Sequence, residues 1–219
     1  MTHSAPNVLE RFLRYVQFDT QSDETSAAAP STAKQLKLAE ALTDELHQLG
    51  IGNAAIGQGG VVYAHIPASP ECEGLPAVGF IAHMDTSPDA SGLHVKPQII
   101  RFDGTDVLLN PTEGIRFPVE RFPEIKKYIG EDVIFTDGTT LLGADDKSGI
   151  AAIMDMAAKI TADPTIAHAK LCIAFTPDEE IGRGTANFDL ERFGADWAVT
   201  IDGGEVGTLE NENFNAGSA

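Results

Sequence analysis

The sequence is poor in the residues that support disulfide-bonded, nucleic-acid-binding or membrane proteins. Only two of its 219 residues are cysteine, Cys72 and Cys172, so we expect no disulfide framework and no cysteine-rich zinc site, and a reducing cytoplasm fits best. Lysine and arginine number 15 against 33 aspartates and glutamates, and this charge of -18 argues against nucleic acid and anionic lipid as partners. No apolar run approaches the roughly 20 residues that span a bilayer. The charged, amphipathic segment MTHSAPNVLERFLRYVQF does not predict a secretory signal.

What the chain does contain is enough aliphatic surface for a folded core, since 42% of its residues are hydrophobic. Apolar residues recur at helical spacing over 7–18, 31–49 and 146–160. Short apolar runs of strand length stand elsewhere: GVVYAHIP from Gly60, LPAVGFIAH from Leu75, KLCIAF from Lys170 and DWAVTI from Asp196. This order predicts an α/β fold with a mixed, largely parallel central sheet.

Several local features can be predicted more closely. Ser31 or Thr32 is placed to cap the second helix, and Gly50 stands where a left-handed residue would end it. Residues 86–137 are rich in proline and glycine and predict a hairpin-like excursion from the core. Trp197, inside the last apolar run, is expected to pack in the core.

Side chains that can bind a metal follow the strand-like runs or precede the third helix. They are His83 and Asp85, Asp145 and Asp146, Glu179 and Glu180, and Asp202. In open α/β sheets, ligands bind at the carboxyl ends of the strands, so these loops are expected to converge on one place.

Each of these groups has an ordinary structural explanation when it is taken alone. A single His-x-Asp triplet is a weak signal, Asp145 or Asp146 could be a helix N-cap, and Asp202 before two glycines could be a simple turn. Glu179 and Glu180 are harder to explain, because adjacent carboxylates repel unless one binds a cation and the other acts as a base.

The chemistry of the set narrows the choice of metal. One imidazole with several carboxylates is a hard, mixed nitrogen and oxygen site, which suits zinc, manganese or cobalt and does not suit iron-sulfur or copper centres. The carboxylates outnumber the needs of one ion, which indicates two metals that share a bridging carboxylate.

Four motifs in order now resemble a known family. They are His83-Met84-Asp85, Gly143-Ala144-Asp145-Asp146-Lys147, Asp178-Glu179-Glu180-Ile181-Gly182 and Asp202-Gly203-Gly204. The chain resembles the di-zinc exopeptidases of the aminoacylase and glutamate carboxypeptidase type, and within them the tripeptide aminopeptidases, along its whole length. The resemblance implies a three-layer catalytic domain of the zinc-exopeptidase kind.

The resemblance also implies a role for each site residue. Asp145 would bridge two zinc ions, His83 and Asp202 would complete one of them, and Glu180 would bind the other. Glu179 would be the general base that deprotonates water, and Asp85 would hold the His83 ring in place. The peptide bond between Asp145 and Asp146 is typically cis in such proteins.

Members of this family are about twice as long as the present chain. A lid domain, also used for dimerisation, interrupts their catalytic domain, and the last metal ligand is a histidine in a later segment. The resemblance therefore implies that residues 1–210 are the first part of an incomplete catalytic domain, that 211–219 begin the lid, and that the complete protein is a homodimer. Neither His94 nor His168 lies in a matching motif, so the metal at Glu180 would lack a ligand, and we expect this chain alone to be inactive.

The function that follows is the release of the N-terminal residue from tripeptides by water activated with two zinc ions, cobalt or manganese being possible substitutes. The partner would be a short peptide. Two alternatives stay open at this point: a di-zinc carboxypeptidase or N-acyl amino acid deacylase with the same core, and an inert fragment or metal-binding module.

Overall fold

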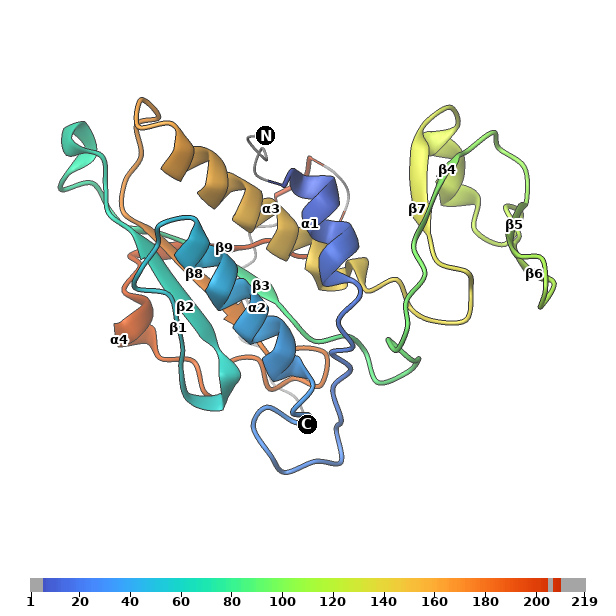
Figure 1. Ribbon diagram of the computed structural model, residues 1–219, viewed down its shortest axis with the longest axis horizontal. Coiled ribbons are helices and arrows are strands. Elements are labelled where there is room, and N and C mark those ends of the chain that lie inside the picture. Colours follow the sequence, from blue (N-terminus) through green and yellow to red (C-terminus); the bar gives the residue numbers. More distant parts are fainter. Residues whose placement is uncertain (1–5, 205–206, 210–219) are drawn as a thin grey trace.

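A five-stranded mixed sheet forms the centre of the molecule (Figure 1). The structure is a computed structural model that describes residues 6–204 and 207–209. The sheet order is β1-β2-β8-β3-β9. The bounds are β1 (Ala55–Ile56), β2 (Val62–Ile66), β3 (Val78–His83), β8 (Leu171–Thr176) and β9 (Trp197–Thr200). All four predicted apolar runs are therefore strands, and the α/β fold with a mixed sheet is confirmed.

Three neighbouring strands of the sheet run in the same direction. β8 pairs with β3 in parallel, from Leu171 opposite Val78 to Thr176 opposite His83, and β9 pairs with β3 in parallel on its other side. β2 runs antiparallel to β8, and β1 antiparallel to β2. All six residues of β8 are buried, as expected for a continuous apolar run in a strand that has neighbours on both sides. The carboxyl ends of β3, β8 and β9 consequently meet at the same edge.

Three helices cover one face of this sheet, α1 (Val8–Tyr15), α2 (Gln35–Gln48) and α3 (Ala144–Ala162). Their buried side chains form one apolar cluster with those of β2, β3 and β8, including Leu38, Leu42, Ile150, Met154, Ile173 and Phe175. The helical spacing of these residues in the sequence is the reason that each helix turns one apolar face to the sheet.

The buried Arg11 ties these helices together. Its guanidinium lies 2.8 Å from Glu45 of α2 and 3.1 Å from Asp155 of α3, and the residue is 1% exposed. A buried charge of this kind is tolerated only when it is paired, so the three helices are fixed in one relative position.

The start of α2 differs from the prediction. Neither Ser31 nor Thr32 caps the helix: the N-cap is Lys34, which makes no side-chain cap bond. The Ser31 hydroxyl instead donates to the carboxylate of Asp178, at 2.5 Å. The side chain that was expected to cap α2 is therefore bonded to a residue far away in the sequence. The predicted end is confirmed, since Gly50 follows the helix with φ +86°, and its N–H donates to the carbonyl of His47.

The opposite face of the sheet carries a smaller apolar cluster under α4 (Leu190–Phe193), where Phe193 packs with Tyr63, Cys172 and Ala174. Trp197, expected in the core, is 54% exposed, so that prediction is wrong. The reason is its strand: β9 is the last strand of the sheet, and no further strand of the described residues covers its outer edge.

The predicted excursion is confirmed and stands to one side of the main sheet (Figure 1). Two small antiparallel pairs form it: β4 (Gln98–Arg101) with β7 (Asp132–Phe135), and β5 (Val107–Asn110) with β6 (Ile115–Phe117). The described residues also contain short 3-10 helices at Gln58–Gly60, Pro70–Cys72 and Pro123–Tyr128. Among the described residues, none of the helices is long and apolar enough to cross a membrane. The predicted lid segment, 211–219, lies outside the described residues.

Candidate metal centre

His83 is the centre of the site, at the last position of β3, and is 2% exposed. Its Nε2 lies 2.7 Å from Asp145 Oδ1, 3.8 Å from Glu179 Oε2 and 3.9 Å from Asp202 Oδ2. Asp145 lies in the first turn of α3, and Glu179 and Asp202 lie in the segments after β8 and β9, so the convergence predicted from the sequence is observed. One ring nitrogen therefore faces three acids that lie up to 119 positions away in the sequence.

Three of the predicted ligands form a compact group. One ligand atom of each of His83, Asp145 and Asp202 lies within 4.8 Å of the other two. The imidazole is buried, whereas the Asp145 side chain is 64% exposed and that of Asp202 34% exposed, so the group opens to solvent on its acidic side. A buried nitrogen ligand with partly exposed carboxylates is a suitable arrangement for a cation that must also meet a substrate.

Asp145 and Asp146 have separate tasks, although they are neighbours in the sequence. Asp146 is 2% exposed, and its carboxylate accepts the N–H groups of His83 and Gly149, both at 3.1 Å. Asp146 thus holds together the first turn of α3 and the end of β3, while Asp145 faces the His83 ring. The alternative in which one of the two aspartates is the N-cap is wrong, because the N-cap of α3 is Gly143, which makes no side-chain cap bond. The peptide bond between the two aspartates is cis.

Asp85 is completely buried and joins the loops after β3 and β8. Its carboxylate accepts the N–H of Glu179 at 2.9 Å and that of Glu180 at 3.1 Å, and Oδ1 lies 3.4 Å from Nδ1 of His83. The backbone carbonyl of Asp85 is also 3.1 Å from that nitrogen. One residue thus orients both the imidazole and the turn that carries the two glutamates.

The two glutamates differ in position. The Glu179 carboxylate lies 3.8 Å from Nε2 of His83 and is 51% exposed. Neither glutamate belongs to the compact group that His83, Asp145 and Asp202 form in the described part of the chain. Burial raises the pKa of Glu179, and the charges of Asp202, Asp85 and Asp145 add to this effect against that of His83. Burial also raises the pKa of Glu180, and Asp145 is the next cause.

The same electrostatics affect the histidine. Burial opposes a charge on the His83 ring, but its hydrogen bond with Asp85 and the charges of Asp85 and Asp146 outweigh that cost and raise its pKa to about 10. Burial raises the pKa of Asp146 to about 7, and the charge of Asp202 contributes. Without a cation, the acids of the site thus keep a proton on the imidazole.

Lys147 and Asp178 belong to the motifs, but their roles were not evident from the sequence. Lys147 is 1% exposed, donates to the carbonyl of Phe18 at 2.8 Å, and has a pKa that burial lowers to about 8. Asp178, 4% exposed, directly precedes the glutamates and bonds to Ser31 and Gln35. The only sequence signal for either was its place beside a predicted ligand or base.

Comparison with known proteins identifies close relatives. The chain is 57% identical to peptidase T of Desulfitobacterium hafniense and 55% identical to peptidase T of Clostridium acetobutylicum, in each case over 97% of its own length. The chain is a homologue of peptidase T. It spans about half the length of these relatives, 52% of each. No family model matches the sequence.

Solved structures agree on the fold. A tripeptidase from Staphylococcus aureus matches with a TM-score of 0.63 and 24% identity, over 91% of this chain and 43% of that one. The aminopeptidase PepT of Bacillus cereus matches with a TM-score of 0.62 and 24% identity, over 90% and 43%. The present chain therefore has the α/β fold of these two proteins, and it matches less than half of the length of each.

Proposed function

We propose that this chain is part of a two-zinc aminopeptidase that releases the N-terminal residue from tripeptides. The observation that carries the proposal is the convergence of His83, Asp145 and Asp202 within 4.8 Å, with the Glu179 carboxylate 3.8 Å from the same imidazole nitrogen. The name of the relatives, peptidase T, supports the same reaction.

The donor set fits zinc. One imidazole nitrogen and carboxylate oxygens are ligands that zinc takes in hydrolytic enzymes, and the cluster of unneutralised acids around His83 is what a divalent cation would offset. In this proposal His83 and Asp202 would hold one ion, Glu180 would hold the second, and Asp145 would contribute to both. Cobalt and manganese accept the same ligands and would be substitutes.

Zinc bound there would polarise the scissile carbonyl and make a nearby water more acidic. Glu179 would take the proton from the attacking water and pass it to the amine that leaves when the peptide C–N bond breaks. Its raised pKa suits this double task, because a base that must later give up its proton works best with a pKa nearer to neutrality.

The surrounding residues would hold this geometry. Asp85 orients the His83 ring through its Nδ1 side, which leaves Nε2 for the metal. Acids beside the metals would also attract the free ammonium group of a short peptide. The cytoplasmic location, the homodimer, and the division into a catalytic segment 1–210 and a lid from 211 stay predictions.

The experiment that tests the function is replacement of Glu179 in the full-length protein. Glu179→Gln keeps the shape of the side chain and removes its basicity, so turnover of tripeptides should fall by at least about 100-fold. The zinc content, measured by atomic absorption, should stay nearly unchanged. Ordinary turnover in the variant would refute the role of Glu179.

A substrate panel separates the proposal from its closest alternatives. Tripeptides, dipeptides and N-acyl amino acids are incubated with the unaltered full-length protein, and the first released product is identified by mass spectrometry. We expect the N-terminal residue of a tripeptide. A released C-terminal residue or a free acyl group would instead identify a carboxypeptidase or a deacylase.

A further inference from the structure

Asp178 occupies an unusual position directly before the two glutamates. It is one of two residues other than glycine with a positive φ among the described residues, at +62°, and it is 4% exposed. A positive φ is unfavourable for an aspartate unless neighbouring groups hold it there.

The Asp178 carboxylate is fully used by the segment that leads into α2. Oδ2 accepts the N–H of Ser31 at 2.7 Å, and Oδ1 accepts the Ser31 hydroxyl at 2.5 Å and the Gln35 amide at 2.6 Å. In return, the N–H of Asp178 donates to Oε1 of Gln35 at 3.2 Å. All three residues are buried, so each of these bonds is costly to lose.

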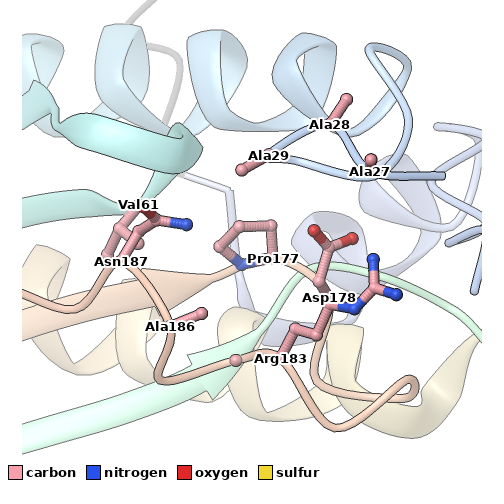
Figure 2. A pocket seen from close by; sticks show the side chains of 10 residues that line it. Ala27, Ala28, Ala29, Val61, Pro177, Asp178, Arg183, Ala186 and Asn187 are labelled. Atoms are coloured by element: carbon pink, nitrogen blue, oxygen red, sulfur yellow. The ribbon is translucent and has the colours of Figure 1, made fainter.

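The turn that starts at Asp178 is fixed at further points. The N–H of Arg183 donates to the carbonyl of Asp178 at 2.8 Å, and its guanidinium donates to the carbonyls of Ser26 and Glu24, at 2.6 and 2.9 Å. Figure 2 shows Asp178 and Arg183 side by side under residues 27–29, at the edge of a cavity of about 290 Å³. At the end of the turn that carries the glutamates, Asp85 accepts the N–H groups of Glu179 and Glu180, and the carbonyl of Glu179 accepts the N–H of Gly182 at 2.7 Å.

We infer that Asp178 is a positioning residue: its carboxylate, held by Ser31 and Gln35, fixes the turn that places Glu179 and Glu180 at the metal centre. What the two glutamates do there rests on the proposed function. The placement itself does not, because it is a matter of hydrogen bonds between described residues. The 31–35 segment is thereby part of the support of the site, although it contributes no ligand.

The test is hydrogen exchange of the backbone amides, measured by NMR on this chain without metal. In Asp178→Asn the new NH2 group must face a donor, either the Ser31 amide or the Gln35 amide. We expect the amides of Glu179 and Glu180 to exchange at least about tenfold faster, and those of β8 to keep their rates.

A charge swap provides the rescue. In the double variant Asp178→Asn, Gln35→Glu, the glutamate can accept from both the new side-chain amide and the backbone N–H of residue 178, so slow exchange should return. The matched control is Asp44→Asn with Gln48→Glu, the same changes on exposed residues of α2, which should alter neither set of amides.

If Asp178→Asn does not fold, Ser31→Ala removes one donor only and should accelerate the same two amides to a smaller extent. Unchanged exchange of Glu179 and Glu180, or equal acceleration of the β8 amides, would overturn the inference. Because the measurement needs neither metal nor substrate, its failure is distinguishable from a failure of the proposed peptidase activity.

Discussion

A buried imidazole surrounded by carboxylates is the feature that defines this site among its single residues. His83 is buried, yet its pKa is raised to about 10, and Asp146 beside it has a pKa raised to about 7. The two shifts have different causes: burial is the largest cause for Asp146, whereas for His83 the hydrogen bond with Asp85 and the charges of Asp85 and Asp146 outweigh the opposing effect of burial. A metal ion would supply the same compensation and would have to displace the proton from His83.

The metal-free chain should consequently lose stability as the pH rises from 6.5 to 8. A folded-state pKa above the unfolded value stabilises the fold fully below the unfolded pKa, 6.5 for histidine, and this contribution is lost as the pH rises toward 10. Asp146 acts in the same direction below pH 7. Lys147, with a lowered pKa of about 8, opposes the trend only above that pH. The measurement is urea unfolding in the presence of a chelator.

A difference of one bound proton between the folded and unfolded states changes the free energy of unfolding by about 1.4 kcal/mol per pH unit. This is the largest slope that His83 alone can produce. In His83→Gln the slope should be clearly smaller, whereas His94→Gln, a change at an exposed histidine, should keep it. An identical slope in the chain and in His83→Gln would show that the proton is not bound at His83.

The close packing of α3 against the end of β9 determines where one candidate ligand, Asp202, lies. A Cβ placed on Gly149 would lie 2.2 Å from the carbonyl oxygen of Ile201 and 2.4 Å from Oδ1 of Asp146. The next residue after Ile201 is Asp202, so this close approach of helix and strand end sets the position of one candidate ligand. Only glycine leaves room for it.

Gly149→Ala should therefore weaken both the fold and the metal site. In an ordinary helix a change from glycine to alanine makes the folded protein more stable. Here the added methyl group would overpack the contact with Ile201, so the free energy of unfolding should fall by about 1–3 kcal/mol and Asp202 should move away from His83. Urea unfolding and zinc titration calorimetry measure the two effects. Gly52→Ala, where nothing lies within 4 Å, is the control. A more stable variant with unchanged zinc affinity would contradict this packing.

The elements show what the sequence could predict and what it could not. β8 could be predicted because five apolar residues in a row, Leu171 to Phe175, are typical of a strand buried on both faces. The cap of α2 was not, because Ser31 bonds to Asp178, which is 147 positions away. The prediction that Trp197 is buried failed for a related reason. An apolar run indicates a strand, but it does not indicate whether that strand lies inside the sheet or at its edge, where β9 lies.

At the scale of the whole molecule, the sheet converts distant motifs into one site. The sequence order of the four motifs predicted their convergence, since parallel strands bring their carboxyl ends together. It did not predict that Asp146 accepts the N–H groups of His83 and Gly149, or that Asp85 accepts those of Glu179 and Glu180, because these bonds depend on side-chain directions. Part of the charge of -18 is thus concentrated where cations would offset it.

Zinc titration calorimetry of this chain shows whether His83, Asp145 and Asp202 are ligands of a metal ion. We expect zinc to bind the unaltered chain at one site or more, with release of a proton at pH 7.5, and Asp145→Asn to lose at least about tenfold in affinity. The exposed Asp44→Asn should bind as the unaltered chain does. Absence of zinc binding, or equal affinity in Asp145→Asn, would show that these residues do not form a metal site.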